Sequence, residues 1–322
     1  MTSRVLRPTL IFSARWVFCL VVVFTLPVST ATLHARGASE NDGVLAVGAV
    51  QFAVSEEIYS GTREFKNAVN ASLDRMERKA ESEAPGRRID LAVFPEYTSA
   101  FLALSYLDSD KQSALADDPA AIRQLKRTTV IRVLKESERD TMSIWSEIAA
   151  ERGYAILAGS TLVVGPNGGI RNRALLFDRN GTLQWTQDKS FPGAPETELL
   201  SLTAGRISDA EPFVVDGRQI VATICRDTYN EVWEEVLPPA DLWIDIKANE
   251  LPYTPEYYDE ALAERLPDSP IDRGLTVSLA GEILGFRFSG PTEYLYDFGP
   301  VAGTDPWAEN VVLIVLYPPD RL

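Results

Sequence analysis

The sequence is poor in histidine and cysteine, two residue types that enzymes often use as bases and nucleophiles. Among 322 residues there are one histidine, His34, and two cysteines, Cys19 and Cys225. A chain that lost its first 35 residues would keep Cys225 and no imidazole. It could form no internal disulfide and no Ser-His-Asp or Cys-His site, and we expect no metal, since most zinc sites need histidine or several cysteines. Its nucleophile would have to be activated by a carboxylate or an amine.

The first 35 residues have the layout of a secretory signal peptide. Arg4, Arg7 and Arg15 precede an apolar run at 16–28, and small residues follow it. The run has 13 residues, against roughly 20 for a membrane-spanning helix. We therefore expect residues 1–35 to be cleaved and the protein to be exported, periplasmic or secreted. An uncleaved membrane anchor is the alternative, and only then would the protein be attached to a membrane.

Long apolar runs are absent from the rest of the chain, and positive charge is scarce. The sequence has 46 acidic and 31 basic residues, with a formal net charge of −15. Such a field repels nucleic acid, so we exclude nucleic acid as a partner. The length is sufficient for a sizeable core, and no charged linker divides residues 44–322, which we interpret as a single domain.

Apolar runs alternate with amphipathic stretches along this domain. The pattern predicts strands at 44–52, 89–94, 154–164, 172–178, 182–187, 213–215, 219–224 and 242–246. It predicts helices at 62–82, 119–135, 141–152, 227–236 and 255–266, with a charged break between the second and the third. Asn180-Gly181 predicts a type I′ hairpin turn, and a second strand pair turns at Asp216-Gly217. Interleaved helices, strands and hairpins indicate a layered α/β domain with mixed sheets.

Three reactive side chains follow predicted strands. Glu96 comes just after the strand 89–94, Lys189 after 182–187 and Cys225 after 219–224. Loops at that end of the strands converge on one crevice in α/β sheets. We therefore expect the carboxylate, the amine and the thiol to share one site.

These residues stand in contexts that resemble the motifs of the nitrilase superfamily of carbon–nitrogen hydrolases, in the family's chain order. The segments that carry the likeness are 93–96 (VFPE), 178–189 (DRNGTLQWTQDK), 224–227 (ICRD) and 240–249 (ADLWIDIKAN). The likeness is weaker beyond residue 249, although 288–290 and 296–299 are similar to the family's final hairpin. It implies a four-layer αββα sandwich with two mixed β-sheets, no cofactor, and a carbon–nitrogen hydrolase domain over 44–322.

The resemblance also implies a role for each reactive residue. Cys225 would be the nucleophile that forms a thioester with the substrate, and Glu96 the general base that takes the thiol proton. Lys189 would stabilise the oxyanion, together with a backbone N–H near Arg226. The expected reaction is hydrolysis of a small-molecule amide or carbamoyl compound. The family also implies a homodimer or a higher oligomer.

A second carboxylate follows the lysine in many members of the family and orients the lysine or the water. Glu196 and Glu198 are both candidates here, and we prefer Glu196 slightly. The chain departs from the family at Phe191, where a histidine is frequent, and at Arg226, where an aromatic residue commonly follows the cysteine. Cys-Arg-Asp is closer to amidase-type branches than the Cys-Trp-Glu of true nitrilases.

Three other functions are compatible with these residues. An N-acyltransferase would pass the same thioester's acyl group to an amine, although the family's lipoprotein-acylating branch has several membrane spans. A non-catalytic protein could keep the scaffold and bind a ligand. A thiol redox enzyme would turn over peroxide without releasing ammonia.

Several residues near the motifs have two interpretations. Arg226 and Asp227 could pair at a helix start, or Arg226 could contact the substrate. Asp245 and Lys247 could be strand residues without a role. Four aromatic residues could line a pocket mouth or serve in ordinary packing: Trp243, Tyr253, Tyr257 and Tyr258.

Overall fold

Two six-stranded mixed sheets form the centre of the fold. The computed structural model describes residues 44–250, 262–296, 299–308 and 311–317, and residues 39–322 make one compact unit. The first sheet runs, in spatial order, β15 (Val311–Tyr317), β1 (Leu45–Gln51), β3 (Leu91–Val93), β4 (Ala155–Val164), β5 (Ile170–Phe177) and β6 (Leu183–Asp188). In it β1, β3 and β4 are parallel and the other neighbours antiparallel.

The second sheet has the same plan. In spatial order it runs β14 (Gly299–Gly303), β13 (Glu293–Tyr296), β10 (Arg273–Ser278), β9 (Leu242–Lys247), β8 (Arg218–Ile224) and β7 (Phe213–Val215). Here β8, β9 and β10 are parallel and the outer neighbours antiparallel. The sequence patterns did not predict β10 to β14 as strands.

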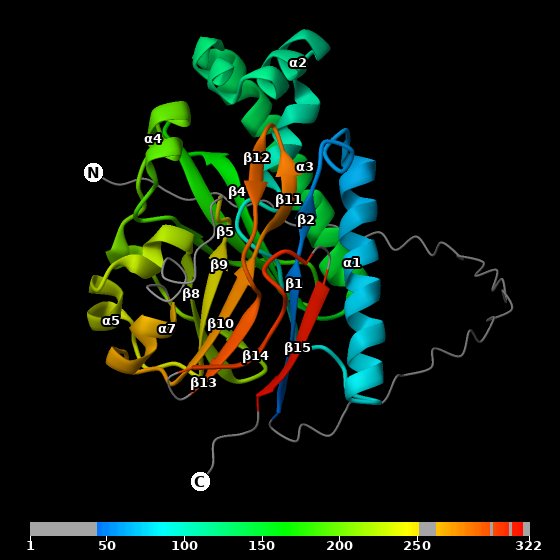
Figure 1. The fold of residues 1–322 in the computed structure, drawn as a ribbon, viewed down its shortest axis with the longest axis vertical. Helices are drawn as coiled ribbons and strands as arrows, with labels where there is room; N and C mark the ends of the chain where they lie inside the picture. The colour runs from blue at the N-terminus through cyan, green and yellow to red at the C-terminus, as the bar shows by residue number, and fades with distance from the viewer. Residues whose placement is uncertain (1–43, 251–261, 297–298, 309–310, 318–322) are drawn as a thin grey trace, which may run out of the picture. The chain divides into compact units, whose positions relative to one another are not determined.

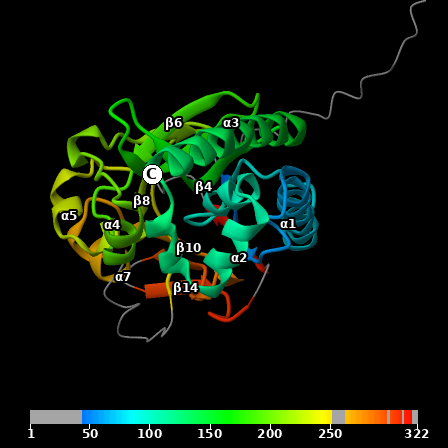
Figure 2. The same ribbon diagram turned by 90° about the horizontal axis from the view of Figure 1, so that it is seen from above.

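The two sheets pack face to face and helices cover their outer faces (Figures 1 and 2). One apolar cluster joins side chains of both sheets, such as Leu91 and Leu157 from the first and Ile224 and Ile244 from the second. On the outer face of the first sheet lie α1 (Thr62–Glu83) and α3 (Arg127–Arg152). On that of the second lie α5 (Val232–Val236) and α7 (Leu262–Arg265). The predicted four-layer αββα sandwich is confirmed.

Smaller elements surround the sandwich. A third sheet, not predicted, orders β12 (Phe286–Phe288), β11 (Ala280–Ile283) and β2 (Ala53–Val54). The remaining helices are α2 (Ser109–Asp117), α4 (Ala194–Leu200) and the 3₁₀ helices η1 (Ala100–Tyr106), η2 (Pro119–Gln124), η3 (Ile207–Asp209), η4 (Cys225–Tyr229) and η5 (Leu266–Asp268). Within the ranges that the structure describes, no helix combines the length and apolarity needed to cross a membrane.

The helix α1 shows why the amphipathic pattern was informative. Phe65, Val69, Leu73 and Met76 recur at three- and four-residue spacing and are all fully buried against the first sheet, as a one-faced apolar stripe requires. The approach to β1 is close because Gly48 has no side chain. A Cβ at Gly48 would lie 2.2 Å from the Met76 sulfur.

The charged break predicted between two helices is wrong, because α3 is continuous from Arg127 to Arg152. The charged residues lie on its outer face, where Arg132 and Glu136 form an i,i+4 ion pair at 2.7 Å. Ser137 and Thr141 are buried on the inner face and continue its packing surface. The predicted start was also wrong, since 119–124 is the 3₁₀ helix η2 and the backbone is extended at 125 and 126.

Of the other helix predictions, one needs correction and one can be compared with the structure only in part. The predicted helix 227–236 is divided at Asn230, whose backbone is extended, into η4 and α5. Of the predicted helix 255–266, residues 255–261 lie outside the described part, and α7 and the start of η5 account for the rest.

The two predicted hairpins are present, with different turns. At Asp216-Gly217 both residues have positive φ (46° and 84°), as in a type I′ turn. In the described loop at 178–182, Gly181 alone has positive φ (80°), and Gly181 N–H donates to Asp178 O at 2.9 Å. This is a type I turn closed by a left-handed glycine, so the prediction of type I′ for Asn180-Gly181 was wrong.

Candidate active site

The three predicted reactive residues meet in one pocket built from both sheets. Glu96 follows β3 and Lys189 follows β6, and these strands point the same way because β4, β5 and β6 alternate in direction. Cys225 follows β8 of the facing sheet. All three line a pocket of about 480 Å³, and their side chains are almost completely buried. The expectation of one shared site agrees with this geometry.

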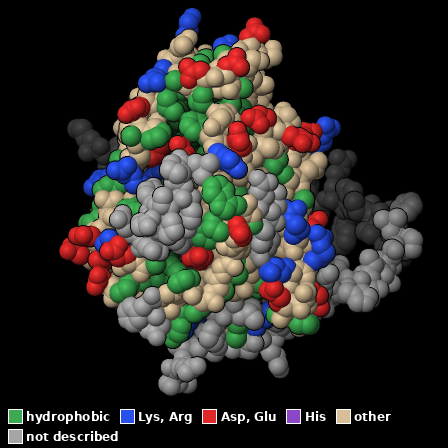
Figure 3. All heavy atoms as spheres, in the orientation of Figure 1, with side chains coloured by type: hydrophobic (Ala, Val, Ile, Leu, Met, Phe, Trp, Pro, Cys, Tyr) green, Lys and Arg blue, Asp and Glu red, His purple; other side chains and the backbone are tan. Residues whose placement is uncertain are grey.

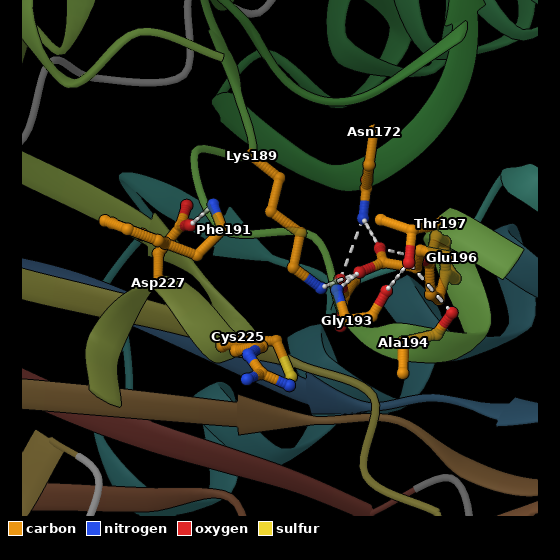
Figure 4. A network of polar contacts seen from close by, with 12 residues as sticks. Asn172, Lys189, Phe191, Gly193, Ala194, Glu196, Thr197, Cys225 and Asp227 are labelled. Atoms are coloured by element: carbon orange, nitrogen blue, oxygen red, sulfur yellow. Dashed lines mark hydrogen bonds and ion pairs between the residues drawn. The ribbon is translucent and has the colours of Figure 1, made fainter. Parts of the chain in front are cut away.

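Lys189 lies between two carboxylates. Its Nζ is 2.8 Å from Glu96 Oε1 and 2.9 Å from Glu196 Oε2, and its side chain is 4% exposed. Asn172, on β5, donates from Nδ2 to Glu96 Oε1 at 2.8 Å and to Glu196 Oε1 at 3.2 Å. In Figure 4 the Asn172 side chain, from β5, and the Lys189 side chain, from just past β6, both point toward Glu196. One ammonium and one amide thus hold both carboxylates in place.

The two candidate second carboxylates have different surroundings. Glu196 lies in the first turn of α4, where its carboxylate accepts hydrogen bonds from the Gly193 backbone N–H and the Tyr97 hydroxyl. Its side chain is 10% exposed. Glu198 is exposed on the same helix. The geometry therefore puts Glu196, and not Glu198, against Lys189.

Cys225 has an unusual backbone conformation. Its φ is 50°, in the left-handed region that non-glycine residues rarely adopt. The residue begins η4, and its Sγ is 3.9 Å from Asn249 Oδ1. Tyr97, next to Glu96, also has positive φ (60°). Strain of this kind collects at functional sites, where the surrounding packing must maintain it.

Burial and charge oppose each other in setting the pKa values of the site. Burial lowers the pKa of Lys189, but Glu96, Cys225 and Glu196 outweigh it and raise that pKa, so the ammonium stays charged. Burial raises the pKa of Glu96, against the opposing effects of Lys189 and the Cys225 thiol. Burial and then Glu96 raise the pKa of Cys225 to about 12, although Lys189 and Lys247 lower it. The resting cysteine is therefore a neutral thiol beside a base.

Known proteins resemble this chain in structure and not in sequence. No family model and no curated protein matches the sequence. An amidase from Nesterenkonia sp. AN1, solved as a double mutant in complex with acrylamide, is similar in structure with a TM-score of 0.62 and 16% identity, over 88% of this chain and 94% of that one. Nit3 of Saccharomyces cerevisiae, a nitrilase-superfamily member, has a TM-score of 0.61 and 15% identity, over 86% and 91%. This chain has the nitrilase-superfamily fold.

Within this nitrilase fold, Asp227, two residues after Cys225, binds the backbone that directly follows Lys189. Its Oδ1 accepts from the backbone N–H groups of Ser190 (2.9 Å) and Phe191 (2.7 Å), a contact visible in Figure 4. Arg226 is exposed and lines the pocket. Among the described residues no ion pair joins Arg226 to Asp227, which removes the helix-start pairing and leaves Arg226 free to face a ligand.

Asp245 and Lys247, both on β9, form an ion pair in the interior. The two side chains are fully buried, with Lys247 Nζ 3.2 Å from Asp245 Oδ2. Lys247 also lies over the Tyr229 ring, 4.6 Å from its centroid. Both charges act on the pKa of Cys225, Lys247 lowering it and Asp245 raising it. A buried ion pair therefore lies beneath the η4 loop of the nitrilase fold.

Trp243 is a packing residue. It is fully buried on the outer face of the second sheet, and its Nε1 donates to Thr223 Oγ1 at 2.9 Å. The predicted pocket-mouth residues Tyr253, Tyr257 and Tyr258 lie outside the described residues. Over the described ranges, no group of three or more His, Cys, Asp or Glu side chains is arranged to hold a metal ion.

The sequence patterns missed Asn172 and Tyr97. Asn172 occupies an inward position on β5, between half-buried neighbours, and a polar residue at a buried strand position indicates a partner in the core. Tyr97 directly follows Glu96, but its reach to Glu196 depends on a contact across 99 positions. No local pattern predicts such a contact.

Proposed function

We propose that the protein hydrolyses a carbon–nitrogen bond of a small-molecule amide through a thioester on Cys225. The observation that carries the proposal is the buried Lys189–Glu96 ion pair in the same pocket as the strained Cys225. A thiol, a carboxylate base and a fixed cation are the groups that covalent amide hydrolysis needs. The fold, shared with amidases, supports the same reaction class.

In the first half of the reaction Glu96 takes the thiol proton of Cys225, and the thiolate attacks the carbonyl carbon of the amide. The charge that develops on the carbonyl oxygen is stabilised by the Lys189 ammonium and by a backbone N–H near Arg226. Glu96 then returns the proton to the amine, the C–N bond breaks, and the acyl group remains on sulfur. The raised pKa of Glu96 suits a group that must both accept and donate the proton.

In the second half, water attacks the thioester carbon and Glu96 takes a proton from the water. As the C–S bond breaks, Glu96 passes that proton to the sulfur of Cys225, so that the thiol and the carboxylate base are regenerated and a carboxylic acid is released. Glu196 and Asn172 keep Lys189 and Glu96 in position throughout, since both contact Glu96 or its partner lysine.

The proposal extends to the whole protein. Residues 44–322 act as one carbon–nitrogen hydrolase domain, assembled as a homodimer or higher oligomer. Residues 1–35 direct export to the periplasm or the medium and are then removed. The apolar run at 16–28 and the small residues after it support export.

The test is intact mass spectrometry of the purified protein after brief exposure to a panel of amides, with Cys225→Ala as control. The expected result is a mass gain equal to an acyl group in the wild type and no gain in the variant, with amidase activity lowered at least about 10³-fold in the variant. Turnover of peroxide without an acyl adduct or ammonia would contradict the proposal and indicate a thiol redox enzyme.

A further inference from the structure

A second, apolar cavity of about 180 Å³ lies beside the catalytic pocket. It is walled by η1, α2, η2, α3 and the β11–β12 hairpin, with side chains such as Phe101, Leu107, Leu115, Leu134 and Phe286. All of its lining side chains are apolar except Tyr97, Glu196 and Glu250. Apolar side chains also gather on the visible surface near α2, between scattered acidic and basic ones (Figure 3).

The cavity adjoins the catalytic pocket. Tyr97, Pro195, Glu196, Ala248 and Glu250 line both of them. The three polar residues of the apolar cavity therefore lie at its junction with the site, and one of them, Glu196, contacts Lys189. A molecule with a polar reacting end and an apolar body would meet matching surroundings along its whole length.

The dimensions allow an estimate of what the cavity holds. An apolar cavity of about 150 Å³ binds a molecule the size of benzene, so this one holds a ring or a chain of about six carbons. Moving each methylene from water into such surroundings increases binding about fourfold. Acetamide-sized substrates would use the catalytic pocket and leave this surface unfilled.

We infer that the substrate is an amide with an apolar group of about benzene size, bound in this cavity while its carbonyl lies at Cys225. The inference rests on the proposed function and narrows its substrate class. The lining residues do not distinguish an apolar acyl group from an apolar amine, and the experiment separates the two.

The first experiment measures kcat/KM along two series of amides. One lengthens the acyl group, from acetamide to decanamide, and the other lengthens the amine, from N-methylacetamide to N-octylacetamide. In one series kcat/KM is expected to rise about fourfold per methylene until the cavity is full. The series that shows the rise identifies the half of the substrate that the cavity binds.

Two variants in the cavity test its position. Ala103→Phe fills it from η1, and Leu115→Ala enlarges it from α2; neither residue lines the catalytic pocket. We expect Ala103→Phe to lower the ratio of long-chain to short-chain kcat/KM about 10²-fold, and Leu115→Ala to move the optimum to a longer chain. The matched control is Ala302→Phe on exposed β14, outside both cavities, which is expected to leave the profile unchanged.

The outcomes separate the inference from the function beneath it. Turnover of short amides with no dependence on chain length would overturn the inference and leave the proposed function standing. The inference would also be overturned if the Ala103→Phe protein lost its oligomeric state but kept the wild-type dependence of kcat/KM on chain length. The cavity would then be a contact between copies of the chain. No turnover and no Cys225 adduct with any amide would overturn the proposed function and the inference together.

Discussion

At the scale of single residues, the site depends on one cation held by two anions. Lys189 Nζ is within 2.9 Å of both Glu96 and Glu196, and all three groups are largely buried. A buried lysine without such partners loses its proton readily. Because the two carboxylates keep it charged, Lys189 is already in place for the oxyanion role that we propose for it.

Glu196 and Glu198 provide a matched pair for testing this arrangement. Glu196→Gln keeps the shape but removes the charge that holds Lys189, so we expect kcat/KM to fall about 10²-fold, mainly through kcat. Glu198→Gln changes an exposed side chain of the same helix and should leave kcat/KM within about twofold. The measurement is steady-state kinetics with thermal unfolding as a check of the fold. Equal losses of kcat/KM in the two variants would show that the Glu196 charge has no specific role in the site.

Asp227 makes a pH-dependent contribution to stability. Burial raises its pKa to about 7, although the Phe191 and Ser190 N–H groups and Lys189 lower it; in an unfolded chain an aspartate has a pKa of about 3.9. The folded state thus binds the proton more tightly, so this contribution is present below pH ~4 and lost as the pH rises through about 7.

Asp227→Asn isolates that contribution, since asparagine keeps an acceptor oxygen but does not titrate. We expect the unfolding free energy of the wild type, relative to the variant, to fall by up to about 4 kcal/mol between pH ~4 and ~8. Urea denaturation of both proteins across that range measures it. A difference that does not change with pH would show that Asp227 stays ionised in the folded protein.

That Glu96, Lys189 and Cys225 share one pocket could be predicted from the sequence, and the contacts around them could not. Glu96, Lys189 and Cys225 each follow a recognisable strand within a family-like motif. Asn172 contacts Glu96 across 76 positions, and Tyr97 contacts Glu196 across 99. Such contacts depend on strand order and side-chain direction, which a local pattern does not contain.

At the scale of elements, two similar turn signals formed different turns. Gly181 and Gly217 both have positive φ and both follow a turn-forming residue. At Gly181 the helix α3 packs closely, with Ser146 Oγ donating to Gly181 O at 2.6 Å. Nothing lies within 4 Å of a Cβ at Gly217. The contact between Ser146 and Gly181 is therefore found where the turn is not type I′, and the local sequence at 178–182 does not contain it.

The two glycines should therefore respond differently to alanine. Gly217→Ala adds only the strain of positive φ, and we expect it to cost about 1 kcal/mol of unfolding free energy. A Cβ at Gly181 would also lie 2.2 Å from Ser146 O, so Gly181→Ala should cost about 2–4 kcal/mol. Urea denaturation of both variants measures the difference. Equal costs would mean that α3 does not press on this hairpin.

The uninterrupted α3 shows a second limit of local patterns. Charged residues at 135–140 predict a break only if they must face the core, and here they lie outward while Ser137 and Thr141 pack inward. By contrast, the mainly apolar runs at β1, β3 and β4 were predicted correctly because strands buried on both faces have few other compositions.

At the scale of the whole molecule, the site exists because two sheets meet. Glu96 and Lys189 follow strands of one sheet and Cys225 follows a strand of the other, and the apolar layer between the sheets sets their separation. The first sheet is completed by β15, whose Val315 pairs with Val47 of β1 across most of the chain. Family-like motifs predicted the sandwich, whereas periodicity alone predicted only a layered α/β domain.

Cleavage of the signal segment would change the number of cysteines in the mature chain. Removal of residues 1–35 leaves Cys225 as the sole cysteine, whereas an uncleaved chain retains Cys19 as well. Titration of thiols in denatured protein recovered from the periplasm or medium should therefore find one thiol per chain, with an intact mass lacking the first 35 residues. Protein that starts at residue 36 and is made without the segment should have the same melting temperature and kcat/KM, because the core and site lie within 44–317. Two thiols per chain in a membrane fraction would instead identify the segment as an anchor.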